Sequence, residues 1–268
     1  MNRLLSMIVP AILGAVVLAP AASADERLRA AIDDPARPDA QTERDEHRHP
    51  YETLTFFGIE PDMTVVELAP GGGWYTEILA PYLAEEGQYV GAHIDPEVEG
   101  LPDFYYDMYQ RWADRISDAE RYGDAEIVGF VPPEATRLGE PGSADMVVTF
   151  RSTHGWKDDG VFDEVLKAAH EVLEPGGVLG VVQHRLPEEA ESETAGYVKQ
   201  SWVVAQAESS GFRLVESSDV NANPDDTADH PNGVWNLPPT LRVEDGDDPE
   251  KYAAIGESDR MTLKFVKR

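Results

Sequence analysis

Residues 63–79, MTVVELAPGGGWYTEIL, begin as a short apolar run with β-branched residues, break at Pro70 and Gly71–Gly73, and resume with helical spacing. This order predicts a buried strand, a tight turn and the start of a helix. Glycines let a ligand approach backbone that carries no Cβ, and free N–H groups at a helix start can face it. Glu67, at the end of the strand, would lie beside that crevice. The alternative interpretation is an ordinary loop between a strand and a helix.

Composition narrows the class of protein. The 268 residues, 41% of them hydrophobic, suit one α/β domain with a real core. The absence of cysteine excludes disulfides, thiolate metal sites and a cysteine nucleophile. A formal charge of -29 repels nucleic acids and anionic membranes, so we expect neither as a partner. The acidic residues are spread along the chain, which favours a solvating surface, one suited to high salt, over an acidic interaction tail.

The N-terminus has the pattern of a signal peptide over residues 1–24. Arg3 provides a basic start, residues 4–18 are nearly all apolar, and Ala22-Ser23-Ala24 is a small-x-small cleavage site. The apolar stretch is short for a membrane span, which needs about 20 residues. We expect a Sec-type periplasmic or secreted protein that begins near Asp25 and has no membrane contact after cleavage. A retained anchor is the alternative.

The rest of the chain alternates between two periodicities. Residues 25–43 are charged and predict a flexible lead-in to a single domain at 44–268. Apolar runs predict strands at 63–68, 88–94, 125–131, 144–150, 178–183, 212–218 and 260–266. Helical spacing occurs at 50–58, 103–121, 162–173 and 196–210. Such alternation predicts an α/β fold with a doubly wound, mostly parallel, Rossmann-like sheet and an antiparallel last strand.

Polar residues follow several of these strands where each one ends. In doubly wound sheets, ligands bind outside the carboxyl ends of the strands. The residues that would meet at this edge are Glu67, Asp95, Glu134, Arg151 to Trp156, His184 and Arg185. A long irregular stretch at 220–257 leaves a strand at the same edge, and we expect it to fold over the site as a cap loop.

Four runs of sequence resemble a known family. They are HRHPYE at 47–52, the segment from Glu67 to Tyr75, TFRSTHGW at 149–156 and VWNLPP at 234–239. With the order of elements, they resemble the class I S-adenosylmethionine-dependent methyltransferase fold and, more narrowly, a family of predicted secreted methyltransferases. The resemblance covers most of the mature chain. It implies S-adenosylmethionine as cofactor and a small-molecule substrate.

The resemblance also implies a cofactor site. The methionine part of the cofactor would lie against Glu67 and the turn formed by Ala69, Pro70, Gly71, Gly72 and Gly73. Glu134 matches the acid that usually meets the adenine amine. The usual motif places an acid for the ribose hydroxyls two residues after a glycine in the second strand. Counted from Gly91, that position is His93, and the nearest acid is Asp95.

The candidate catalytic residues follow the fourth and fifth strands. His154 has an ordinary pKa near 6.5 and is a candidate general base, with a capping or core histidine as the alternative. Arg151 and Arg185 are candidates for orienting an anionic substrate, although an arginine is more often paired with a carboxylate. His184 belongs to the same edge.

The candidate substrate-binding residues are aromatic or come from the cap loop. Tyr75 and Trp156 would close over a planar ligand, with core packing as the alternative. Asn221 and Trp235 would approach from the cap loop. His47 and His49 have no third ligand at a recognisable spacing, so we expect no metal site.

Two functional classes follow from these features. The first is an S-adenosylmethionine-dependent methyltransferase that acts on a small molecule. The second is an exported protein of the same fold that binds another ligand or uses histidine chemistry without methyl transfer. His93 and the export signal favour the second class, whereas the glycine turn, Glu67 and Glu134 favour the first. The sequence has no Gly-x-Ser-x-Gly motif that would indicate a serine hydrolase.

Overall fold

A computed structural model describes residues 23–94 and 96–268. The predicted signal peptide lies almost wholly outside the described residues, as does Asp95. Within the described part of the chain, no helix is long and apolar enough to cross a membrane.

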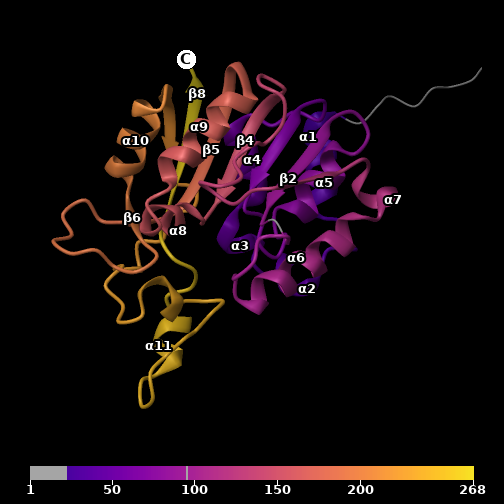
Figure 1. The fold of residues 1–268 in the computed structure, drawn as a ribbon. Helices are drawn as coiled ribbons and strands as arrows, with labels where there is room; N and C mark the ends of the chain where they lie inside the picture. Colours follow the sequence, from indigo (N-terminus) through magenta and orange to yellow (C-terminus); the bar gives the residue numbers. More distant parts are fainter. Residues whose placement is uncertain (1–22, 95) are drawn as a thin grey trace, which may run out of the picture.

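The described residues form an eight-stranded sheet with the order β3-β2-β1-β4-β5-β8-β7, and the short β6 pairs with β5 (Figure 1). The strands are β1 (Thr64–Leu68), β2 (Gln88–His93), β3 (Glu126–Gly129), β4 (Ala144–Phe150), β5 (Leu173–Leu186), β6 (Val198–Lys199), β7 (Phe212–Ser218) and β8 (Arg260–Lys267). The pairs from β3 to β5 are parallel, and β8 runs antiparallel to both neighbours. The prediction of a mostly parallel, doubly wound sheet with an antiparallel last strand is confirmed.

Helices cover both faces of the sheet because the strands are apolar on both faces. Val65 packs in the core that contains residues of α1, α4, α5, α6 and α7, whereas Val66 packs in the core that contains residues of α9 and α10. The longer helices are α1 (Ala24–Ile32), α4 (Pro50–Phe57), α5 (Thr76–Leu83), α6 (Asp103–Ile116), α9 (Phe162–Val172) and α10 (Gln200–Ser209). The short ones are α2 (Asp39–Thr42), α3 (Asp45–Arg48), α7 (Ala119–Tyr122), α8 (Thr153–Asp158), α11 (Pro249–Ala253) and the 3₁₀ helix η1 (Gly233–Asn236).

The strand order places a switch point between β1 and β4. From β1 the chain proceeds outward to β2 and β3, and then returns to the other side of β1 to form β4 and β5. The connections on the two sides therefore diverge at the carboxyl ends of β1 and β4. A crevice between diverging connections is where doubly wound sheets bind ligands.

The predicted flexible lead-in at 25–43 is instead an ordered part of the fold. Helix α1 starts with a capping box in which Ser23 and Glu26 exchange side-chain-to-backbone hydrogen bonds. Leu28 is buried in the core beside α5, and the buried Arg37 forms an ion pair of 2.8 Å with Asp45. The prediction was wrong because it gave weight to charge and proline content and overlooked the capping signal.

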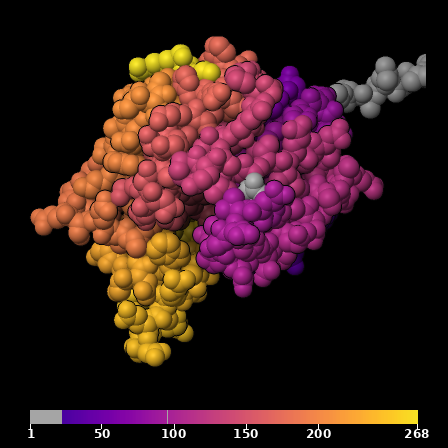
Figure 2. All heavy atoms as spheres, viewed as in Figure 1, coloured from indigo at the N-terminus to yellow at the C-terminus, as the bar shows by residue number. Residues whose placement is uncertain are grey.

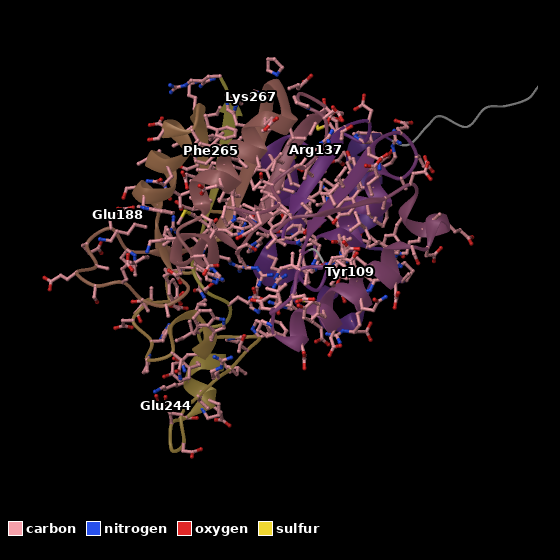
Figure 3. The ribbon with its side chains drawn as sticks, viewed as in Figure 1. Tyr109, Arg137, Glu188, Glu244, Phe265 and Lys267 are labelled. Atoms are coloured by element: carbon pink, nitrogen blue, oxygen red, sulfur yellow. The ribbon has the colours of Figure 1, made fainter. Side chains whose placement is uncertain are left out.

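The cap loop at 220–257 contains η1 and α11 and projects from the sheet as a lobe, yellow in Figures 1 and 2. Figure 3 shows Glu244 at the outer end of this lobe. Its base is fixed by Asp226, whose buried carboxylate accepts hydrogen bonds from Tyr197 and from the backbone of Asp259, and which pairs with His230 over 2.9 Å. The loop therefore has a built anchor.

Candidate functional site

Two cavities open at the switch point. The cap cavity, with a volume of about 240 Å³, is lined by residues that include Ala69, Gly72, Arg151, His154, His184 and Trp235. The β2–β3 cavity, with a volume of about 390 Å³, is lined by residues that include Gly71, His93, Tyr105, Met108, Phe130 and Trp156. Both are lined by Ala69, Gly71, Arg151, Ser152 and His154, so they adjoin one another.

Two residues at the shared wall have left-handed backbone. Ala69 (φ 51°) follows β1, and Arg151 (φ 65°) follows β4. Their N–H groups still donate to the neighbouring strands, Ala69 to Ala92 over 2.8 Å and Arg151 to Val182 over 2.7 Å. Such conformations cost about 1–3 kcal/mol in a residue other than glycine and cluster at functional sites. Here they turn the chain out of each strand at the cavity wall.

His93 fixes the glycine turn from the side of β2. Its Nδ1 accepts a hydrogen bond of 2.8 Å from the N–H of Ile94, so its proton is on Nε2, which lies 3.1 Å from the carbonyl oxygen of Gly71. The ring also packs 4.9 Å from the ring of Trp112. Burial lowers the pKa of His93, which favours this neutral form. His93 therefore contributes a main-chain contact at the usual ribose position.

His154 lies between the cap loop and β5. Its Nδ1 is 3.3 Å from Nε2 of Gln183, and its ring meets the ring of Trp235 edge-on at 5.8 Å. Burial lowers the pKa of His154, so the neutral imidazole predominates at neutral pH. The cap loop and β5 thus hold this ring at the wall of both cavities.

His184 is also a buried imidazole at the wall of the cap cavity, and it is more enclosed than His154. Its Nδ1 lies 2.5 Å from the hydroxyl of Ser258, and its ring is 5.8 Å from that of His154. Burial and the nearby charge of Arg151 hold its pKa well below the usual value. As expected from the strand ends, Arg151, His154, His184 and Trp235 converge beside the glycine turn.

Glu67 does not line either cavity, contrary to the expected cofactor contact. Side chains alternate along a strand, and Glu67 shares the face of Val65, toward α5 and α6. Its buried Oε2 accepts hydrogen bonds from Tyr89 over 2.6 Å and from Thr76 over 2.8 Å. Burial raises the pKa of Glu67 to about 7. Glu67 therefore supports the glycine turn from the side of α5 and does not face the cavities.

Four other residues that were predicted to contact a ligand line neither cavity: Tyr75, Arg185, Asn221 and Glu134. Tyr75 is buried and stacks on Phe150 with ring centroids 3.4 Å apart. Arg185 forms a two-pronged ion pair with Asp259 at 2.8 and 2.9 Å. The remaining two are Asn221, which is buried, and Glu134, which is exposed and lines neither cavity.

Asn221 has a structural partner set that accounts for its burial. Its Nδ2 donates to the hydroxyls of Thr53 and Thr262, each over 2.9 Å.

Trp156 packs edge-on against Phe130 and lines the β2–β3 cavity, away from the predicted substrate position. Among the described residues, no group of three or more histidine, aspartate or glutamate side chains is placed to hold a metal ion.

Sequence reasoning did not single out Gln183, Glu257 or Ser258, whereas Ser152 lies in the predicted run from Arg151 to Trp156. Glu257 and Ser258 line the cap cavity and precede β8. A signal for them was present, because an antiparallel strand begins at the edge where its parallel neighbours end. Gln183 gave no such signal, since it lies within β5 and its partner depends on the tertiary structure.

No protein-family model and no curated protein matches the sequence. The structure is similar to that of an S-adenosylmethionine-dependent methyltransferase from Aquifex aeolicus, with a TM-score of 0.57 and 14% identity over 91% of this chain and 98% of that chain. The fold is that of S-adenosylmethionine-dependent methyltransferases. A methyltransferase from Methanosarcina mazei has a TM-score of 0.50 and 14% identity over 80% of this chain and 96% of its own.

A third similar structure is that of the PH0226 protein from Pyrococcus horikoshii, with a TM-score of 0.52 and 13% identity over 87% of this chain and 93% of that chain. At these identities, the similarity establishes the shared methyltransferase fold. Any activity depends on the residues that line the two cavities.

Proposed function

We propose that the protein is an S-adenosylmethionine-dependent methyltransferase that acts on a small molecule. The observation that carries this proposal is the position of two adjoining cavities at the switch point between β1 and β4. The cofactor would occupy the β2–β3 cavity and extend over the glycine turn. The methyl acceptor would occupy the cap cavity.

The β2–β3 cavity fits the adenosyl part of the cofactor. Its volume of about 390 Å³ and its lining by Tyr105, Met108, Phe130 and Trp156 suit a flat, largely apolar ring system. At the turn, Gly72 has open space where a Cβ would project, which leaves its backbone accessible to the methionine part. The residues present therefore fit S-adenosylmethionine, with contacts other than the expected Glu67 and Glu134.

The chain's own residues would orient the acceptor and exclude water. When bound, S-adenosylmethionine supplies an electrophilic methyl group on a sulfonium sulfur. Nδ1 of His154 faces Nε2 of Gln183, an amide nitrogen whose orientation is fixed because it also donates to the carbonyl oxygen of Gly196. Nδ1 therefore accepts, and Nε2 of His154 carries the proton. We therefore assign hydrogen-bond donation to His154 in place of the proton abstraction expected from the sequence. Trp235 and the following prolines cover the cap cavity, and a dry site strengthens such contacts.

A second candidate is an exported protein that uses these cavities for another ligand without methyl transfer. The observation that favours it is His93, because both of its ring nitrogens contact the main chain of Gly71 and Ile94. At the usual ribose position, the chain thus presents no carboxylate. Export to the periplasm or medium is part of both candidates and rests on residues 1–24. N-terminal sequencing of the exported protein checks it.

Titration calorimetry with S-adenosylhomocysteine and S-adenosylmethionine tests the proposed function. We expect binding to the wild type well below millimolar concentration. Gly155→Leu would fill the β2–β3 cavity, and nothing lies within 4 Å of the added Cβ, so this variant should lose binding and keep its melting temperature. Absence of binding to the wild type would overturn the proposal and leave the second candidate.

A further inference from the structure

The cap cavity is lined by Arg151 and by Glu257, and Glu257 pairs with three further arginines. We call Arg44, Arg48, Arg151 and Arg260 the arginine cluster. Arg44 and Arg48 lie in the segment before α4, Arg151 follows the end of β4, and Arg260 is the first residue of β8. The cluster surrounds the carboxylate of Glu257, which lines the cavity. The chain has a formal charge of -29, so four neighbouring arginines are a local excess of positive charge in an acidic protein.

One carboxylate serves three of these arginines. Oε1 of Glu257 accepts from Nε of Arg44 over 2.6 Å, and Oε2 accepts from Nη1 of Arg260 over 3.0 Å and from Nε of Arg48 over 3.4 Å. Burial opposes ionisation of Glu257, but the three arginines outweigh it and hold its pKa at about 2. The carboxylate is thus ionised at neutral pH and fully engaged.

The guanidinium groups retain donors that no protein group uses. Within the described residues, Nη1 and Nη2 of Arg48 and Nη2 of Arg44 are buried without a hydrogen-bond partner. Arg48 is 1% exposed, and burial holds its pKa well below the usual value. The guanidinium of Arg48 also lies 4.6 Å from the ring centroid of Trp74. The cluster therefore has more positive charge than the single carboxylate of Glu257 neutralises, which favours an anion beside it.

Arg151 is the member of the cluster that reaches the cavities. It lines both of them, and among residues 23–94 and 96–268 no hydrogen bond or ion pair involves its guanidinium. Burial lowers the pKa of Arg151 to about 10, so the group stays charged at neutral pH. A free guanidinium in a partly enclosed cavity is suited to two-pronged contact with a carboxylate or phosphate.

We propose that the cap cavity binds a small anionic molecule through Arg151 and that, given the proposed function, the methyl acceptor carries a carboxylate or phosphate group. Ser152, Thr240 and Ser258 add hydroxyl groups to the same wall. The volume of about 240 Å³ lies below the usual range for drug-sized ligands, which favours a small acid. The carboxylate of S-adenosylmethionine itself is the competing source of negative charge.

Calorimetry with inorganic phosphate and with malonate tests the proposal in the absence of any adenosyl compound. We expect saturable binding to the wild type, at least tenfold weaker binding to Arg151→Gln, and partial recovery in Arg151→Lys. Arg213→Gln removes the same charge from an exposed position on β7 and should bind like the wild type. Equal affinity in Arg151→Gln and the wild type, or no saturable binding of either anion, would overturn the proposal.

A melting curve without added anion separates this role from a structural one. Arg151→Gln removes an unpaired charge from beside three other arginines, so its melting temperature should equal or exceed that of the wild type. A purely structural arginine would lower it when removed. Phosphate should raise the melting temperature of the wild type and leave that of Arg151→Gln unchanged.

The two sources of negative charge are distinguished with 5′-methylthioadenosine, which lacks the amino-acid part of the cofactor. If Arg151→Gln weakens binding of S-adenosylhomocysteine but not of 5′-methylthioadenosine, Arg151 binds the cofactor carboxylate and the inference about the acceptor fails. If both bind as to the wild type, the inference stands. Anion binding without any adenosyl binding would support the anion site while refuting the proposed function.

Discussion

Nε2 of Gln183 donates a hydrogen bond of 2.9 Å to the carbonyl oxygen of Gly196 and lies 3.3 Å from Nδ1 of His154. A carbonyl oxygen can only accept, so the side-chain amide of Gln183 is fixed with its nitrogen toward both groups. Nδ1 of His154 must then accept, and in the neutral ring the proton is on Nε2. One glutamine in β5 thus determines what His154 can offer to a ligand.

We predict that His154 is the Nε2–H tautomer in the wild type and that Gln183→Glu reverses this. A carboxylate at position 183 accepts a hydrogen bond from Nδ1–H and stabilises the imidazolium, so the pKa of His154 should rise. Nitrogen NMR of the histidine rings across pH measures both quantities. Gln110→Glu, at an exposed position on α6, is the matched control. An unchanged tautomer and pKa in Gln183→Glu would contradict the assignment.

His154→Ala should lower turnover by about 10²-fold, the usual effect of losing one positioned donor to the reacting groups. Because the ring lines a cavity and is not packed in the core, the melting temperature should change little. His47→Ala is the control, since its side chain is 41% exposed. The measurement is turnover of the acceptor with S-adenosylmethionine. Equal turnover of the His154 variant and the wild type would remove His154 from the reaction.

Glu67→Gln should stabilise the protein more at pH 8 than at pH 5. Burial raises the pKa of Glu67 from 4.5 to about 7, so the folded state retains a proton that the unfolded state has lost. The contribution of this group is therefore favourable below about pH 4.5 and is lost as the pH rises to 7. A neutral glutamine avoids this loss, worth up to about 3 kcal/mol at pH 8.

Urea denaturation of both proteins at the two pH values measures the difference. The Glu67→Gln variant should also bind S-adenosylhomocysteine like the wild type, because Glu67 lines neither cavity. A large loss of affinity would instead support the direct contact that the sequence motif implies. An equal change in stability at both pH values would contradict the raised pKa.

The sequence predicted seven of the eight strands, because most are short apolar runs with a clear end, but it assigned β6 to a helix at 196–210. Knowing where strands end was enough to bring Arg151, His154 and His184 to one edge. It was not enough to give side-chain direction at Glu67, since one residue of difference at the end of β1 reverses the face. Tertiary partners were also invisible: Arg185 and Asp259 are 74 residues apart.

Asn221→Ala should destabilise the protein by about 1–3 kcal/mol, because two buried threonine hydroxyls lose their hydrogen-bond partner. The residue joins the base of the cap loop to α4 and β8, so anion and cofactor affinities should change little once the variant is folded. Asn232→Ala, farther along the loop, should cost less because the Asn232 amide has a long 3.4 Å contact. Equal stability of the wild type and Asn221→Ala would contradict the anchoring role.

Neighbouring glycines in the turn should respond in opposite ways to substitution. At Gly72 nothing lies within 4 Å of an added Cβ and φ is not positive, so Gly72→Val should fold with an unchanged melting temperature. At Gly73, φ is 80° and a Cβ would lie 2.7 Å from Cδ1 of Trp112, so Gly73→Ala should lose about 1–3 kcal/mol of stability.

The variants Gly72→Val and Gly73→Ala also distinguish an effect on ligand binding from an effect on stability. Gly72 lines the cap cavity where the methionine part is proposed to pass, and a branched side chain there would occupy that path. Gly72→Val should therefore weaken binding of S-adenosylhomocysteine at least tenfold, whereas the folded fraction of Gly73→Ala should bind it nearly normally. Calorimetry beside thermal melting decides the matter. Normal binding by Gly72→Val would show that the ligand does not pass over the turn.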